Sequence, residues 1–441
     1  MFIDFAIGLA GLAFLIALIA LRIPIAYAMI LVGLVGVSLL SGVDIVLSQL
    51  KDLAYSQFSI YDLSVVPMFV LMGNIATRAG LSRDLFTAAN AWLGRFKGGV
   101  AMAAIAACAG FGSVCGSSLA TASTMGQVAY PELRRLKYSP ALATGTLAAG
   151  GTLGILIPPS VVLIIYAIIV EANIVTMFMA AFIPGILAML LFMLTVTIFV
   201  TVKPSAAPKG RAVSSKELME ATVAILPVAT VFAVVIGGIY LGFFNPTPAA
   251  AVGAVLVWVF GIVRKQLNWA GMKSALLETC QTTAMIFLIL LGAELLKIFM
   301  SRGGVPIAAA EAIQGSGLSP MVILVLLLIA LIFLGCLMDS LSMIILAIPF
   351  FWPVLEGLDY GMSIEDMKIW FGIIALVVVE LGLITPPVGM NVFVIHSIAK
   401  DVPMSETFKG VLPFFASEIV RVSLLVAFPS IILFLPRLLG N

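Results

Sequence analysis

Two short stretches decide the fold: GFGSVCGSSLATAST (residues 110–124) and LGCLMDSLSM (residues 334–343). Each places glycine, serine or aspartate in the middle of a long apolar segment, 99–133 in the first case and 319–356 in the second. A simple membrane crossing needs about 20 apolar residues and no such interruption. Each segment is therefore expected to form two half-helices that meet at a tip, which is a re-entrant helical hairpin.

A second pair of motifs follows the two hairpins, GTLGILIPPS (residues 151–160) and LGLITPPVGMN (residues 381–391). The Gly and Pro-Pro of each motif predict a helix that is broken within the membrane. Ser118 lies 222 residues before Ser340, and Gly154 lies 228 residues before Gly382. Two units of one design in opposite orientations form an inverted repeat, which predicts a substrate site where the repeats meet.

The composition requires lipid as the solvent for most of the surface. Hydrophobic residues make up 62% of the chain, charged residues 10%, and the mean hydropathy is +1.23. A soluble domain usually carries about 25% charged residues. The net charge of +2 gives no indication of a nucleic-acid partner, and the four cysteines show no metal-binding or disulfide spacing.

Apolar runs of spanning length predict an all-α polytopic membrane protein with about ten crossings. The expected crossings are 5–21, 24–41, 63–77, 140–172, 175–202, 218–241, 247–263, 274–300, 367–398 and 411–435. If Arg22 is cytoplasmic, the loops on its side hold 17 of the 23 Lys and Arg residues. This bias holds only if both hairpins return to the face from which they entered, the first to the cytoplasm and the second to the outside.

The chain is expected to alternate between a fixed scaffold and a moving unit. The predicted divisions are 1–98 (scaffold helices and first arm helix), 99–173 (first hairpin and broken helix), 174–300 (scaffold helices and second arm helix), 301–400 (second hairpin and broken helix) and 401–441 (C-terminal scaffold helix). The arm helices, SRDLFTAANAWLGRFK (82–97) and NWAGMKSALLETC (268–280), have the amphipathic pattern of helices at the membrane interface.

Polar groups at the tips carry the chemistry. Backbone groups that a tip or a Pro-Pro break leaves unpaired must find partners in lipid, and freed carbonyls suit a cation such as Na⁺. The N-termini of half-helices carry partial positive charge and suit an organic carboxylate. Asp339 is a carboxylate inside an apolar hairpin, so it is expected to face a cation and also to cap the following helix.

Other polar residues in the apolar runs have mainly structural interpretations. Two pairs with a spacing of three are expected to form ion pairs: Glu294 with Lys297, and Glu418 with Arg421. Asn74 and Gln281 are expected to hydrogen bond between helices. Glu380 lies two residues before Gly382 and is expected either to pack structurally or to line the second site or a gate.

SSLATAST, GTLGILIPPS, GCLMDSLSMIILAIPFFWPV and ITPPVGMNVFVI resemble the large membrane subunit (M subunit) of TRAP transporters, of the DctM and SiaM type. The resemblance covers essentially the whole chain. It implies the elevator-type fold of the ion-transporter superfamily, a place in the bacterial inner membrane, and Na⁺-coupled, ATP-independent uptake of an organic acid such as a C4-dicarboxylate, sialic acid or another sugar acid. It also implies two partner chains, a small four-helix Q subunit and a periplasmic substrate-binding protein.

The residues expected to bind solute or ion combine the tips and the breaks. They are Ser117, Ser118, Thr121, Gly154, Pro158, Pro159, Asp339, Ser340, Gly382, Thr385, Pro386, Pro387 and Asn391. The resemblance implies Na⁺ near Ser117, Gly154, Asp339, Gly382 and Thr385, and no cofactor beyond this coupling ion.

Three alternatives remain open. The first is a stand-alone Na⁺- or H⁺-coupled organic-anion carrier of the same superfamily, which would need no partner chain. The second is a membrane enzyme, against which the sequence offers no HExxH, GxSxG or paired-carboxylate motif. The third is a channel, which fits poorly because tips that break both half-helices suit an occluded site.

Overall fold

The computed structural model describes residues 2–21, 23–208, 210, 213–315 and 317–439, and every regular element in these ranges is helical. The first half contains α1 (Phe2–Ala20), α2 (Ile25–Ser41), α3 (Val43–Phe58), α4 (Val65–Arg78), α5 (Leu81–Leu93), α6 (Gly99–Cys115), α7 (Ser118–Arg135), α8 (Pro140–Leu156), α9 (Val161–Ile169) and α10 (Ile174–Val202). The second half contains α11 (Ser215–Tyr240), α12 (Pro246–Val263), α13 (Trp269–Arg302), α14 (Val305–Gly315), α15 (Pro320–Gly335), α16 (Ser340–Glu356), α17 (Ile364–Gly382), α18 (Met390–Ile398), α19 (Met404–Ala427) and α20 (Ser430–Leu439).

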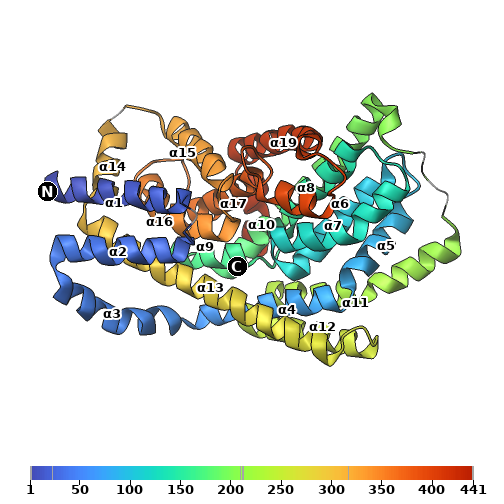
Figure 1. The fold of residues 1–441 in the computed structure, drawn as a ribbon, viewed down its shortest axis with the longest axis horizontal. Helices are drawn as coiled ribbons and strands as arrows, with labels where there is room; N and C mark the ends of the chain where they lie inside the picture. The colour runs from blue at the N-terminus through green and yellow to red at the C-terminus, as the bar shows by residue number, and fades with distance from the viewer. Residues whose placement is uncertain (1, 22, 209, 211–212, 316, 440–441) are drawn as a thin grey trace.

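Both predicted hairpins are pairs of helices separated by a short break. The first consists of α6 and α7, with Gly116 and Ser117 between them, and the second consists of α15 and α16, with residues 336–339 between them. The two arms of each hairpin pack against each other. In Figure 1 the first hairpin occupies the right-hand half of the molecule and the second the left-hand half.

Both predicted breaks after the hairpins are confirmed. α8 ends at Leu156 and α9 begins at Val161, with a bend of 48° between the two helices. α17 ends at Gly382 and α18 begins at Met390. Each Pro-Pro pair contains a cis peptide bond. The order hairpin, long helix, Pro-Pro break and short helix thus occurs twice, as the repeat in the sequence predicts.

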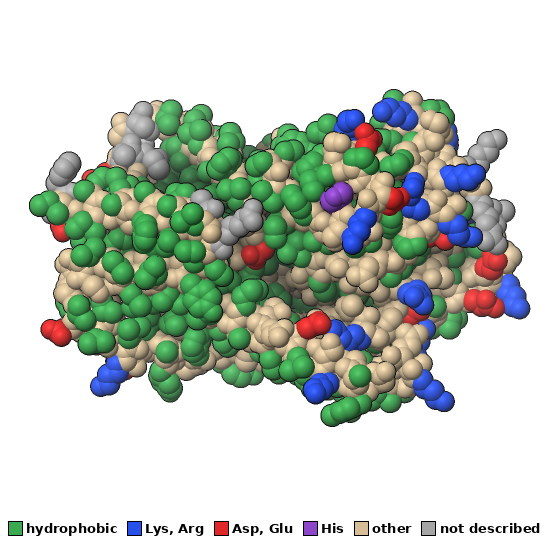
Figure 2. All heavy atoms as spheres, viewed as in Figure 1, with side chains coloured by type: hydrophobic (Ala, Val, Ile, Leu, Met, Phe, Trp, Pro, Cys, Tyr) green, Lys and Arg blue, Asp and Glu red, His purple; other side chains and the backbone are tan. Residues whose placement is uncertain are grey.

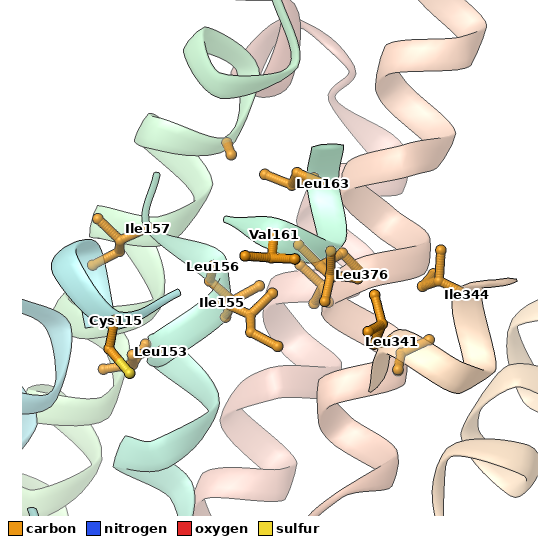
Figure 3. Packing of buried hydrophobic residues seen from close by; sticks show 14 of the residues in the cluster. Cys115, Leu153, Ile155, Leu156, Ile157, Val161, Leu163, Leu341, Ile344 and Leu376 are labelled. Carbon is orange, nitrogen blue, oxygen red and sulfur yellow. The ribbon is translucent and has the colours of Figure 1, made fainter. Parts of the chain in front are cut away.

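Apolar packing joins the two units. Figure 3 shows Ile155, Leu156 and Val161 of the first break close to Leu341 and Leu376 of the second unit. Helix α9 packs on both α16 and α17, so the short helix of the first break is enclosed by the second unit. α10 and α19 also pack on α8, while α13 packs on α2 and α4, and α4 packs on α12. The first break, residues 157–160, is therefore buried, whereas Pro386 and Pro387 of the second break are exposed.

The helix boundaries differ from the expected ones in several places. A helix at Val43–Phe58 was not among the expected crossings, because its polar residues lower its hydropathy. The expected second arm, 268–280, is the beginning of the continuous 34-residue helix α13 rather than a separate element. The expected crossing 411–435 is wrong as a single helix, since α19 ends at Ala427 and α20 follows after Phe428 and Pro429.

The number of crossings stays a prediction. Five described helices are long and apolar enough to span a membrane, and up to seven spans result if each of two bent helix pairs counts as one. Figure 2 shows most Lys and Arg side chains of its face toward the end where α5, α11 and α12 lie, and a largely hydrophobic surface elsewhere. Arg22, Lys209 and Arg211, which add to the expected basic excess, lie outside the described residues.

The expected ion pairs are confirmed. Lys297 Nζ lies 3.5 Å from Glu294 Oε1 near the surface. Arg421 is fully buried and donates two hydrogen bonds to Glu418 Oε2 and one to the carbonyl of Pro184, at 3.1 Å from Nη1. Asn74 donates to Thr279 Oγ1 at 3.0 Å and so links α4 to α13, whereas Gln281 is exposed rather than buried between helices.

Removal of Arg421 should therefore be costly. The variant Arg421→Met leaves the buried Glu418 carboxylate without its partner, and we expect a loss of about 3–5 kcal/mol in unfolding free energy. The double variant Arg421→Met with Glu418→Leu should recover most of that loss, because neither charge is then buried alone. Unfolding in detergent, with Lys297→Met as a control at a more exposed pair, measures the difference. Equal losses of unfolding free energy in Arg421→Met and Lys297→Met would contradict the assignment of Arg421 and Glu418 as a buried ion pair.

Cysteine labelling tests the hairpin topology. In a Cys280→Ser background, single cysteines at Lys97 and Lys137 flank the first hairpin, and cysteines at Ser319 and Asp359 flank the second; all four positions are exposed. We expect 97 and 137 to react with an impermeant maleimide from the cytoplasmic side, and 319 and 359 from the outside. A hairpin whose two ends react from different sides would be a crossing, which would invalidate the repeat.

Candidate functional site

A cavity of about 400 Å³ lies where both hairpin tips face α4 and α13. It is lined by Val70, Gly73, Asn74, Cys115, Gly116, Ser117, Ser118, Leu119, Ala120, Ile155, Val161, Val162, Thr282, Met285, Ile286, Asp339, Ser340, Leu341 and Met390. The predicted residues Ser117, Ser118, Asp339 and Ser340 thus lie on one wall, although more than 200 residues separate the two pairs. The opposite wall, from α4 and α13, carries no motif in the sequence and was not predicted.

The first tip is a tight turn that begins a helix. Gly116 has φ +65°, a left-handed conformation that favours glycine, and its close contact with the carbonyl of Pro159 leaves little space for a side chain. Ser117 caps α7 by accepting a hydrogen bond from the amide of Ala120 at 3.4 Å. The N-terminus of α7, with its partial positive charge, therefore lies at the cavity.

The second tip repeats this arrangement with a carboxylate. Asp339 caps α16, since its Oδ2 accepts from the amide of Ser342 at 3.1 Å and its Oδ1 from the Ser342 hydroxyl at 2.5 Å. The capping expectation for Asp339 is confirmed. Among the described residues, Asp339 forms no ion pair with a Lys or Arg, so its charge lies at the cavity wall without a protein cation.

Glu380 joins the two tips. It lies in α17, is 1% exposed, and accepts a hydrogen bond on each carboxylate oxygen. Ser118 Oγ donates to Oε2, and Ser340 Oγ donates to Oε1 at 2.5 Å. Sequence reasoning left Glu380 out of the expected binding residues, although it is the only carboxylate in the run 367–398. A single carboxylate in a long apolar run is the feature of the sequence that could have identified Glu380 as a functional residue.

A buried oxygen without a hydrogen-bond partner lies close to the first tip. Thr121 is fully buried, and its hydroxyl has no hydrogen-bond partner. Gly154 of α8 lies directly against it, because a Cβ built at Gly154 would be 2.4 Å from Thr121 Oγ1 and 2.7 Å from the Ser117 carbonyl oxygen. The close approach of α8 to α7 therefore brings a hydroxyl and a backbone carbonyl together in a dry environment. Oxygen atoms of this kind suit a hard cation.

Asn391 connects the second break to the first unit. It is fully buried at the start of α18, and its Nδ2 donates to the carbonyl of Ala148 in α8 at 3.3 Å. Its Oδ1 is a further buried oxygen with no hydrogen-bond partner. In this hydrogen bond the second unit donates to the first, whereas in the contact between Ser118 and Glu380 the first unit donates to the second.

The other predicted residues surround the two breaks without lining the cavity. Pro158 and Pro159 are buried, whereas Pro386 and Pro387 are exposed. Gly382 lies against Gly335 of α15, and Thr385 Oγ1 donates to the carbonyl of Leu381 at 2.6 Å. Gly382 thus lies with the second hairpin, whereas Pro159 lies close to Gly116 of the first tip.

The chemical character of the cavity follows from its lining. Hydroxyls, one amide, one carboxylate and the N-termini of α7, α9, α16 and α18 supply its polar groups, and the remaining side chains are apolar. The lining residues include no Lys or Arg. The site can therefore hold a small polar solute, but a negative charge on that solute would rely on helix N-termini and on cations held nearby.

Comparison with known proteins shows which proteins the chain is similar to. The family model described as "Tripartite ATP-independent periplasmic transporter, DctM component" matches residues 12–431. The chain is 34% identical to the C4-dicarboxylate TRAP transporter large permease protein DctM of Pseudomonas aeruginosa, over 86% of this chain and 87% of that protein. It is 32% identical to the sialic acid TRAP transporter large permease protein SiaM of Vibrio cholerae, again over 86% and 87%.

A solved structure shares the fold. The chain superposes on the YdaH transporter of Alcanivorax borkumensis with a TM-score of 0.62 at 15% identity, covering 88% of this chain and 89% of that one. The helical architecture is therefore one already seen in a membrane transporter, while the low identity limits this comparison to the fold.

The contact at Gly154 yields a prediction. Gly154→Ala places a methyl group against a backbone carbonyl and a buried β-branched side chain, and we expect a loss of about 1–3 kcal/mol in unfolding free energy. Gly237→Ala is the matched control, because a Cβ there meets nothing within 4 Å. Unfolding of both variants in detergent gives the comparison. Equal stability of Gly154→Ala and the control would show that α8 does not approach the tip this closely.

Proposed function

The chain belongs to the DctM family of tripartite ATP-independent periplasmic transporters, and on that premise we propose that it carries a small organic acid into the cell with Na⁺ as the coupling ion. As a member of this family it is an integral protein of the bacterial inner membrane and a transporter permease. The substrate class, the coupling ion and an elevator motion are the parts that we propose.

One observation carries the proposal: the tips of two hairpins from opposite halves of the chain meet at one cavity of about 400 Å³. A site at the interface of two repeats, built from broken helices, is the arrangement expected of a secondary transporter. The wall opposite the tips comes from α4 and α13, which pack on each other in a layer that also holds α2, on α13, and α12, on α4. Sliding of the tip-bearing unit along that layer would expose the cavity alternately to the two sides.

The solute and the ion would use different atoms. A carboxylate of the solute would meet the N-termini of α7 and α16, where Ser117 and Asp339 cap the helices. Sodium, as a co-transported ion, would use oxygens such as Thr121 Oγ1, the Ser117 carbonyl and Asn391 Oδ1, of which the two side-chain atoms lack a hydrogen-bond partner. The predicted placement near Gly382 and Thr385 remains part of this proposal. Bound cations would offset the charges of Asp339 and the solute.

Two partner chains belong to the proposal. The family description is tripartite and periplasmic, which implies two further components in addition to the permease. We propose a small membrane Q subunit and a periplasmic substrate-binding protein. The two relatives compared above are named for C4-dicarboxylate and for sialic acid, so the acid carried by this chain is to be identified by experiment.

A proton-coupled carrier without partner chains is the second candidate, and one observation favours it. Glu380 is a fully buried carboxylate within hydrogen-bonding distance of both tips, and such a group is a candidate proton site. Uptake into proteoliposomes distinguishes the two candidates, because uptake by a proton-coupled carrier follows the pH gradient and needs no binding protein.

Uptake into proteoliposomes tests the proposal. With the permease, its small subunit and its binding protein present, uptake of a C4-dicarboxylate or sialic acid should require an inward Na⁺ gradient and stop when that gradient is collapsed. Asp339→Asn keeps a good helix N-cap and removes the charge. We therefore expect the rate of Na⁺-dependent uptake to fall at least about tenfold, with unchanged stability of the protein. Asp359→Asn, in an exposed loop, is the matched control.

The opposite results are equally clear. Uptake that follows a pH gradient and ignores Na⁺ would support the second candidate. Wild-type Na⁺ dependence in Asp339→Asn would show that this carboxylate takes no part in the ion-coupled step. Uptake by the permease alone would show that no binding protein is required.

A further inference from the structure

Three segments that are distant in the sequence meet at one carboxylate. Ser118 begins α7 at the first tip, Ser340 begins α16 at the second tip, and Glu380 lies two residues before the end of α17. Ser118 and Ser340 are 1% and 3% exposed, so this contact is closed to solvent. The lining of the cavity includes both serines but not Glu380.

The chemistry suits a bridge between the tips. A carboxylate has two equivalent oxygens that only accept hydrogen bonds, and each tip supplies one hydroxyl donor. Hydrogen bonds to a charged acceptor are shorter and stronger than those between neutral groups. A glutamine at this position would offer one acceptor and one donor, and could not accept a hydrogen bond from both serines on separate oxygens.

The bridge exists once, although the architecture occurs twice. The residue that corresponds to Glu380 in the first unit is Thr152, which lies two residues before Gly154. Thr152 Oγ1 donates to the carbonyl of Ala149 in its own helix at 2.6 Å and does not reach either tip. A single group from the second unit therefore holds the tips of both.

We propose that Glu380 is a positioning residue that clasps the two hairpin tips into one wall of the cavity. The inference rests on the proposed transport function, since the clasp lets both tips move together along α4 and α13. Without it the tips can separate from α17 one at a time, and the cavity then opens within the moving unit instead of passing intact to the other side. Glu380 does not touch the cavity, so its effect on solute is indirect.

Hydrogen exchange of the purified protein, without solute and without partner chains, tests the clasp independently of transport. We expect Glu380→Gln to accelerate amide exchange about tenfold in both tip segments, 113–125 and 336–346, because each tip loses a hydrogen bond to a charged group. Exchange in α2 and α12 should not change. Glu380→Asp keeps the charge but is one methylene shorter, so it should loosen at least one tip.

The serines supply a second, independent set of variants. Ser118→Ala with Ser340→Ala should reproduce the faster exchange, and adding Glu380→Gln to this pair should cause little further change, because all three act through one contact. Glu294→Gln, an acidic residue of α13 outside the clasp, should leave exchange at both tips at the wild-type rate.

Transport then shows whether the clasp matters for function. In proteoliposomes where the wild type takes up solute, Glu380→Gln should lower the maximal uptake rate at least tenfold while the KM for solute changes less than threefold. Faster exchange at only one tip in Glu380→Gln, faster exchange throughout the protein, or a wild-type uptake rate with both tips loosened would each overturn the proposal. Failure of wild-type uptake itself would overturn the proposed function and leave the exchange result standing.

Discussion

The fold depends on one constraint, which is that backbone groups freed inside a membrane must find partners in the protein. Both hairpin tips and both Pro-Pro breaks free such groups, and the structure collects all four in one region. Side chains cap the helices that follow: Ser117 for α7, Ser160 for α9 and Asp339 for α16. Two of the buried side-chain oxygens that lack hydrogen-bond partners, Thr121 Oγ1 and Asn391 Oδ1, lie in the same region. Polar groups freed within the membrane must find partners inside the protein, so the four interruptions lie together. Their polar groups then form the proposed binding site.

The two halves of the chain share their polar groups across this region. Asn391 of the second unit donates to α8 of the first, and Glu380 of the second unit accepts from Ser118 of the first. Apolar contacts around Val161 and Leu341 add to this interface (Figure 3). Neither half is therefore complete alone, which explains how residues from two distant motifs can form one cavity wall.

Local patterns in the sequence predicted local structure well. The glycines and serines of 110–124 predicted a tip, and the Pro-Pro motifs predicted breaks, because these residues act on their own backbone. The partner of a buried side chain depends on tertiary packing, so the contact of Ser118 with Glu380 could not be predicted. Hydropathy alone missed α3, and it could not predict that Trp269–Arg302 is one continuous helix or that α19 ends at Ala427. The wall formed by α4 and α13 carries no motif at all.

The difference between Thr152 and Glu380 limits how such a chain can have evolved. A protein with two identical halves would have either no carboxylate behind its tips or two, and two like charges in one dry pocket would repel each other. Once a single acidic residue served both halves, the duplicate copies could no longer replace each other. A substitution at Ser118 is then constrained by a residue that lies 262 positions away in the other half.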